Sequence, residues 1–270
     1  MNRICRWVVV IMGIFNVAFG SSVPERKLNP EALKILFEYF GIDQQNPLGD
    51  TQKKWLRKPG QERWQVPELP DEQRNFVLQW AAEQGFFAPL KPTKMEYDKA
   101  LILGATTARM EKRLNYLTKL WSEGVRFKEI VWLNGERPLD PSAERVPENC
   151  KTEADVAKWI WKEAELPEGM KVLPVVFVVS PKTSFKPRPT TDDTIQDWLK
   201  TSPNPCACLF ISDQPFCGYQ FAMVKALLPL GFQPDIAGDG ADPAKNPKAG
   251  ANTLETIAQW IYAESLSCSR

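Results

Sequence analysis

The stretch 208–232, CLFISDQPFCGYQFAMVKALLPLGF, decides how the rest of the chain is interpreted. An apolar run ends at Ile211, the polar turn SDQP follows at 212–215, and an amphipathic helix is expected from about Gly218. A short strand that is apolar on both faces and leads into a helix is typical of a parallel sheet covered by helices. Because ligands bind beside the turns at the carboxyl ends of such strands, this turn is a candidate site.

The same alternation of apolar runs and amphipathic segments continues on both sides of this stretch. The expected strands are 100–104, 129–135, 172–180, 208–212 and 232–238. The expected helices are 108–121, 152–165, 193–200, 219–230 and 253–265. The pattern predicts an α/β fold with a parallel sheet of about five strands flanked by helices.

An N-terminal helical extension precedes the sheet. Asn29-Pro30 is a typical helix start, and the helix that follows is expected to end at Gly41. A second helix is expected over 71–84. The basic segment between them, 51–70, contains two tryptophans and three prolines and is predicted to be irregular. It is either a partner-binding surface or a loop whose tryptophans are anchored in the core.

Residues 1–20 have the pattern of a secretory signal peptide. Arg3 and Arg6 precede a short apolar run, and Ala18-Phe19-Gly20 supplies small residues for cleavage. We therefore expect an exported protein, periplasmic or secreted, whose mature chain begins near Ser21 and has no later membrane span. The alternative is an uncleaved segment that anchors the protein in the membrane.

Composition excludes several classes of function. The chain has 34 basic and 33 acidic residues, so it lacks the positive field that holds nucleic acid, and no nucleic-acid partner is expected. It contains no histidine. Ser-His-Asp and Cys-His nucleophile systems, histidine-ligated metals and imidazole bases are therefore excluded.

Five cysteines follow the predicted cleavage point: Cys150, Cys206, Cys208, Cys217 and Cys268. An odd number leaves at least one thiol unpaired within the chain, and the spacing does not reveal any pairing. Residues 206 and 208 share one face of a strand, so a zinc site including residue 217 is conceivable. Small buried core residues are the favoured interpretation, and no metal is expected.

Three polar features lie at predicted strand ends. The turn 104–107 places a glycine and two threonines before a helix, where backbone amides attract anions, although an ordinary helix cap explains it equally well. Glu153 follows Thr152 at another helix start and is either part of a cap or a catalytic or ligand-binding group. The basic loop 180–193 either closes over an anionic ligand or is simply solvated.

The order of these motifs resembles the envelope-associated SanA/ElyC/YdcF family, known as domain of unknown function 218. That family has a strand with a Gly-rich turn and then a helix with Arg-Leu, as in Leu103-Gly104 and Arg113-Leu114 here. Its Ser-Gly-Gly strand end is matched loosely by 134–136, and its Ser-Glu-Ala helix start closely by 152–154. Its Asn-Thr-x-Glu-Asn motif has a nearest equivalent at 190–194.

This sequence also departs from the family pattern. Ala105 stands where the family continues with glycine. The family histidine would fall at Pro215 or Phe216, and the following arginine at Gly218 or Tyr219. Both functional side chains are missing, so a histidine-dependent step is excluded. The similarity covers roughly residues 95–240.

The resemblance implies a Rossmann-like α/β domain with a role in envelope or peptidoglycan maintenance. From the pattern of the whole chain we place this domain at 96–270, after an N-terminal helical extension over 21–95. We expect a small phosphorylated or glycan-type ligand at the strand ends, with no particular cofactor indicated. The general acid/base candidates are Glu153 and Asp213. The ligand-binding candidates are Gly104, Thr106, Thr107, Arg113, Asn134, Asp193 and Ser212.

Two alternatives from other classes remain. One is a non-catalytic interaction protein that kept the fold and lost the chemistry, with 51–69 and the basic loop as contact surfaces. The other is a thiol enzyme, which requires an exposed thiol of low pKa at Cys217 near a helix start. Whether the protein is an enzyme stays open at this point.

Overall fold

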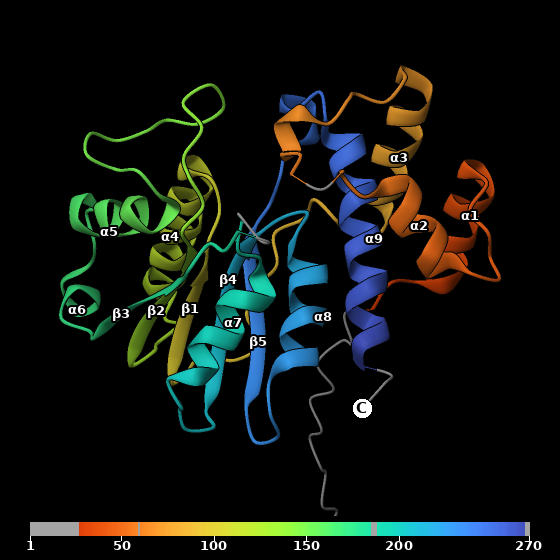
Figure 1. Cartoon of the computed structure of the whole chain (residues 1–270). Helices are drawn as coiled ribbons and strands as arrows, with labels where there is room; N and C mark the ends of the chain where they lie inside the picture. The colour runs from red at the N-terminus through yellow and green to blue at the C-terminus, as the bar shows by residue number, and fades with distance from the viewer. Residues whose placement is uncertain (1–26, 59, 185–187, 268–270) are drawn as a thin grey trace, which may run out of the picture.

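The sheet lies at the centre of the α/β part of the molecule. The computed structural model describes residues 27–58, 60–184 and 188–267. Within them, parallel strands form one five-stranded sheet in the order β3-β2-β1-β4-β5 (Figure 1). The strands are β1 Lys99–Leu103, β2 Glu129–Gly135, β3 Val175–Ser180, β4 Ala207–Asp213 and β5 Gln233–Asp239. The predicted Rossmann-like α/β class, with its parallel sheet and flanking helices, is confirmed.

Helices cover both faces of this sheet. In the α/β part they are α4 Thr107–Ser122, α5 Glu153–Glu163, α6 Glu168–Lys171, α7 Thr191–Lys200, α8 Cys217–Leu227 and α9 Ala249–Ser267, with the short 3-10 helix η2 Pro243–Lys245. α4 and α5 contact each other over one face, and α7 and α8 contact each other over the opposite face. This arrangement places a helix start beside the carboxyl end of the preceding strand.

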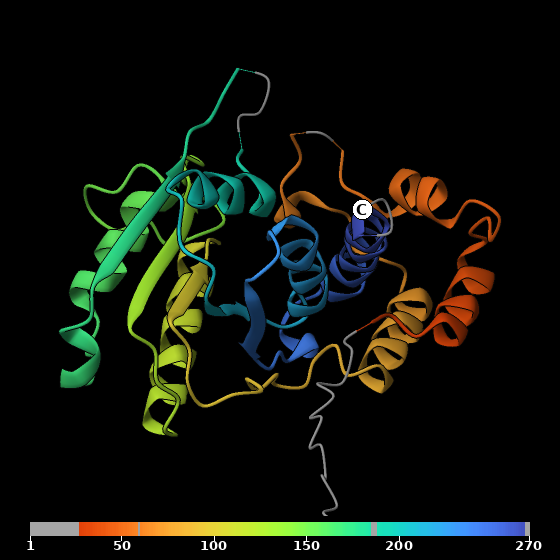
Figure 2. The ribbon, with the colours of Figure 1, turned by 90° about the horizontal axis from the view of Figure 1, so that it is seen from below.

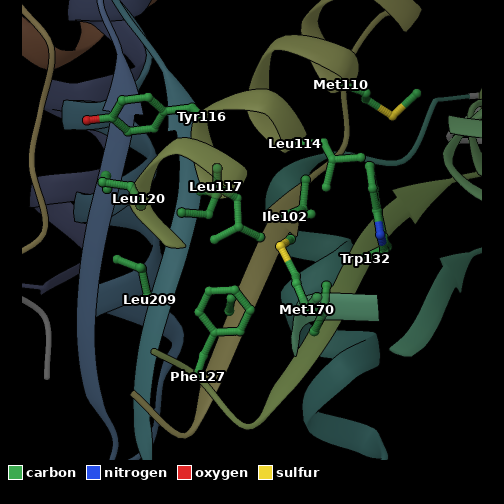
Figure 3. Close-up of a cluster of buried hydrophobic side chains, with 14 of the residues drawn as sticks. Ile102, Met110, Leu114, Tyr116, Leu117, Leu120, Phe127, Trp132, Met170 and Leu209 are labelled. Atoms are coloured by element: carbon green, nitrogen blue, oxygen red, sulfur yellow. The ribbon is translucent and has the colours of Figure 1, made fainter. Parts of the chain in front are cut away.

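The core between α4 and the sheet follows from the spacing of apolar residues on the helix. Met110, Leu114 and Leu117 recur at intervals of four and three, so they lie on one face of α4, and all are buried. Figure 3 shows this face against Ile102 of β1 and Trp132 of β2. The packing fixes the start of α4 at the edge of the sheet where the strands end.

The N-terminal segment is helical, as predicted. It contains α1 Pro30–Phe40, α2 Pro47–Trp55, the 3-10 helix η1 Arg63–Gln65 and α3 Asp71–Glu83. Asn29 caps α1 and Gly41 ends it in the left-handed conformation, as the sequence indicates. Figure 2 shows α9 lying between α8 and the N-terminal helices, which contact it through α2 and α3. The C-terminal helix therefore joins the N-terminal segment to the α/β part.

The segment 51–70 is more regular than predicted, because α2 runs through its first five residues to Trp55. The helix begins at Asn46-Pro47, with the Asn46 side chain accepting from the Gly49 amide, which is the same start signal as at residues 29–30. Trp55 is buried, and Trp64 donates from Nε1 to Asp140 Oδ2 at 2.9 Å. Both tryptophans therefore anchor this segment.

The predicted signal peptide, residues 1–20, and Cys268 lie outside the described residues. None of the helices within the described ranges combines the length and apolar character that a membrane crossing requires.

Candidate functional site

A cavity of about 1100 Å³ opens at the carboxyl ends of the strands. Strand order reverses between β1 and β4, and the cavity is bounded by the turns that follow these two strands. The N-terminal segment, the end of the basic loop from Arg188 onwards, and α9 supply further walls. In open α/β sheets, the crevice at this reversal is where ligands bind.

Asp213, the last residue of β4, joins two arginines of α4. Its Oδ1 accepts from Arg113 Nε at 2.8 Å and from Arg109 Nη2 at 2.8 Å, while its Oδ2 accepts from Arg109 Nε at 3.0 Å. Burial raises the pKa of this carboxyl, but the two guanidinium groups outweigh burial and hold the pKa at about 2. Asp213 is therefore ionised at neutral pH and suited to positioning arginines rather than to moving protons.

The two arginines differ in what they can offer a ligand. Arg113 is 1% exposed and donates from Nη1 to the carbonyls of Leu103 at 2.5 Å and Gly104 at 2.8 Å, so its donors are used inside the protein. Arg109 is 25% exposed, and its guanidinium carbon lies 3.9 Å from the centre of the Phe216 ring. Arg109 is the better anion ligand of the two.

A second arginine group enters the cavity from the N-terminal segment and from the end of the basic loop. Glu255 of α9 forms an ion pair with Arg57, with Nε 3.0 Å from Oε1, and accepts a hydrogen bond from Arg63 Nε at 3.3 Å. Arg188 pairs with Glu62. Burial, followed by the nearby charge of Arg57, lowers the pKa of Arg188 to about 10. Positive charge is thus concentrated on this wall.

Glu153 lies at the start of α5 beneath the turn after β1. Its Oε2 accepts from Arg137 Nε at 3.1 Å and its Oε1 from the Gly135 amide at 3.2 Å. Burial raises its pKa even though Arg137 acts in the opposite direction. Arg137 also holds Glu144 through two bonds, at 2.6 and 3.1 Å. Glu153 therefore belongs to a buried ionic group that supports the floor of the cavity.

The first backbone amide of α4 already donates to a carboxylate of the protein itself. Thr107 donates from its backbone nitrogen to Glu144 Oε2 at 3.0 Å, and its hydroxyl donates to the Arg145 carbonyl at 2.7 Å. Thr106 is the N-cap residue of the helix and lines the cavity. The chain itself thus satisfies part of the anion-binding capacity expected of this helix start.

Of the residues singled out from the sequence, the structure brings five together at the cavity: Gly104, Thr106, Arg113, Glu153 and Asp213. The other four lie outside its lining. Asn134 is buried and donates to Met110 Sδ at 3.3 Å, and the hydroxyl of Ser212 donates to Gln220 Oε1. Thr107 contacts Glu144 as described. Asp193 accepts from the Thr190 amide at 2.7 Å at the start of α7.

Sequence reasoning did not select several basic residues that line the cavity: Arg57, Arg63, Arg109, Lys112, Arg188, Lys245 and Lys248. The signal for Arg109 was its position one helical turn before Arg113, which places both on the same side of α4. Arg188 belongs to the basic loop that was expected either to close over an anion or to be solvated. The other basic residues of this list are brought to the cavity by tertiary contacts that the local sequence does not indicate.

The cysteines favour a structural interpretation. Cys217 is fully buried at the start of α8, which contradicts the exposed thiol that a thiol enzyme needs there. The sulfurs of Cys206 and Cys208 lie 3.4 Å apart, as expected for residues on one strand face. Burial strongly raises the pKa of the Cys208 thiol, so this thiol is not activated at neutral pH.

Gly104 is placed where no side chain fits. A Cβ at this position would lie 2.0 Å from Glu153 Oε1 and 2.8 Å from the Leu133 carbonyl oxygen. Glu153 and the strand-end turn can therefore approach each other only across a glycine.

We expect Gly104→Ala to lower the free energy of unfolding by about 1–3 kcal/mol, because the added methyl group must displace both neighbours. Urea denaturation checks this. Gly169→Ala is the matched control, since its Cβ would meet only the Trp121 ring, at 3.2 Å. A Gly104→Ala protein as stable as the control would contradict the close approach.

No family model, curated protein or solved structure matches this chain. The resemblance described from the sequence motifs therefore stays a prediction, and the site has to be interpreted from its own geometry.

Proposed function

We propose that the protein binds a small phosphorylated ligand in the cavity at the carboxyl ends of β1 and β4. The observation that carries this proposal is an excess of positive charge. The basic residues of the lining are Arg57, Arg63, Arg109, Lys112, Arg113, Arg188, Lys245 and Lys248. The acidic residues of the lining are Glu153, Asp192, Asp213 and Asp242. Such an excess in a partly desolvated cavity favours an anionic ligand.

The lining also supports an organic portion of the ligand. Phe87, Phe216, Tyr219 and Met223 contribute apolar surface beside the arginines. Apolar walls with a few convergent polar groups are typical of small-molecule sites, and the cavity is slightly larger than most of them. Phe216 and Tyr219 line the cavity without filling it, which favours a ligand site over a scaffold that has lost its cleft. A glycan without phosphate would leave the excess positive charge of the lining uncompensated.

The proposal concerns binding, and no reaction is assigned. Asp213 and Glu153 were the predicted general acid/base residues, and both carboxylates accept hydrogen bonds from arginines. An export pathway and a role in envelope or peptidoglycan maintenance rest on the signal-like N-terminus and the motif resemblance alone, and they stay predictions.

Thermal unfolding against a panel of sugar phosphates, nucleotides, polyprenyl phosphates and phosphate-free glycan fragments tests the proposal. A ligand that binds only the native state adds ~2.7 kcal/mol at a hundred times its dissociation constant. We expect phosphorylated compounds to stabilise the protein and their phosphate-free counterparts to have no effect.

Arg109→Gln should weaken the binding of any such compound about tenfold or more, because it removes a partly exposed guanidinium at the carboxyl ends of β1 and β4. Arg126→Gln is the control, since Arg126 stacks on Trp121 and does not line the cavity. If phosphorylated compounds give no shift, the proposal fails and the interaction protein becomes the better hypothesis. Equal binding by both variants would place the ligand elsewhere.

A further inference from the structure

Two separate ionic groups face the cavity, and each carries a surplus positive charge. In the first, Arg109 and Arg113 share the single carboxylate of Asp213. Both arginines come from α4, and the carboxylate comes from the end of β4. Two cations with one anion leave one positive charge uncompensated within this group.

The second group is built by distant parts of the chain. Arg57 and Arg63 share Glu255, and Arg188 pairs with Glu62, which also lies 3.9 Å from Arg57. Three cations with two anions again leave one positive charge. Arg57 Nη1 is buried and has no hydrogen-bond partner among the described residues, so a donor is left for a ligand.

The two groups meet at the Phe216 ring. The guanidinium carbon of Arg63 lies 4.3 Å from the ring centre, and that of Arg109 lies 3.9 Å from it. The distance between the two guanidinium carbons therefore cannot exceed the sum of these values. Like charges that lie close together in a partly desolvated site repel each other. Burial is the main cause that lowers the pKa of Arg109; Asp213 opposes it, and the charges of Arg113 and Arg63 lower the pKa further.

We infer that the two arginine groups form adjacent phosphoryl subsites, so that the ligand is an organic diphosphate rather than a monophosphate. This inference rests on the proposed function and narrows it. A diphosphate carries two anionic groups joined through one oxygen, so it can meet Arg63 and Arg109 at once and neutralise the surplus of both groups. A monophosphate can satisfy only one of them.

Isothermal titration of the purified protein with inorganic pyrophosphate and with orthophosphate tests the inference. Pyrophosphate should bind at least tenfold more tightly. Arg63→Gln should remove most of that preference and leave orthophosphate binding within a few-fold of wild type. Arg109→Gln should weaken both ions. The double variant should show a coupling between the two residues for pyrophosphate that is absent for orthophosphate. Arg126→Gln should match wild type throughout.

The outcomes separate the two proposals. Equal affinity for both ions, with loss of binding in Arg109→Gln, would overturn the diphosphate inference and keep the proposed function. An unchanged preference for pyrophosphate in Arg63→Gln, with its fold checked by circular dichroism, would also overturn the inference. Failure of both ions and of the whole phosphorylated panel to bind would overturn both proposals.

Discussion

Asp213→Asn is expected to lower the free energy of unfolding by about 3 kcal/mol or more at neutral pH, because it removes the carboxylate that Arg109 and Arg113 share. Asparagine has nearly the same size as aspartate, so the loss of stability measures the effect of the charge and not that of a cavity. Urea denaturation measures it. Asp239→Asn is the matched control: Asp239 pairs with Asp213 in the register of β4 and β5, and its side chain is 41% exposed. The control should cost less than about 1 kcal/mol.

The pH dependence of stability provides a second test, in which wild type is compared with Asp213→Asn. The folded-state pKa of Asp213 is about 2, which is below the value of about 3.9 for an unfolded chain. A depressed pKa contributes stability that is present above the unfolded value and is lost as pH falls through the folded one. The stability gap between wild type and Asp213→Asn should therefore narrow between about pH 4 and pH 2. If the difference in stability did not change with pH, the contribution of Asp213 to stability would not depend on its charge.

The sheet could be predicted closely because its signals are local. The strand β2 contains the continuous apolar run 130–133 between polar residues, which is typical of parallel strands that are buried on both faces. The start of α2 was missed although Asn46-Pro47 repeats the signal used at Asn29-Pro30. The segment 51–70 is basic and rich in proline and tryptophan, and this composition indicated an irregular segment in spite of the helix cap at Asn46.

The site was only partly predictable, because half of it is assembled by long-range contacts. Residues at strand ends, such as Gly104 and Asp213, follow from topology alone, since all parallel strands end at one edge. Arg57 and Arg63 reach the cavity because Glu255, almost two hundred residues later, holds them on α9. Nothing in the local sequence indicates that the C-terminal helix returns to the N-terminal segment.

Arg137 illustrates the same limit, and its removal should have the other large effect. The residue lies just after the expected strand 129–135, yet its side chain is 3% exposed and joins Glu144 and Glu153. Arg137→Met should lower the free energy of unfolding by about 3–5 kcal/mol at pH 7.5, because two buried carboxylates lose their shared cation. Chemical denaturation measures the loss, with Lys128→Met as a control that breaks a solvent-exposed ion pair.

The deficit of this variant relative to wild type should also grow as pH rises, as for Asp213→Asn, but in a higher pH window. Burial is the largest influence on both carboxyls and raises their pKa values. In the native protein Arg137 and backbone donors bring the pKa of Glu144 below its ordinary value, while the pKa of Glu153 stays raised. Without Arg137 both folded-state pKa values should be higher than in wild type. A raised pKa gives stability that is present at low pH and lost as pH rises. Arg137→Met should therefore approach wild type at pH 5 and fall furthest below it at pH 8.

Neutralising the carboxylates provides the decisive control for Arg137. A triple variant with Arg137→Met, Glu144→Gln and Glu153→Gln removes both buried charges, so it should recover part of the lost stability and lose the pH dependence. If the triple variant were less stable than Arg137→Met alone, the carboxylates would be acting through their hydrogen bonds to the Thr107 and Gly135 amides. In that case Arg137 would matter for packing, and the floor of the cavity would be held by the backbone contacts of these two glutamates.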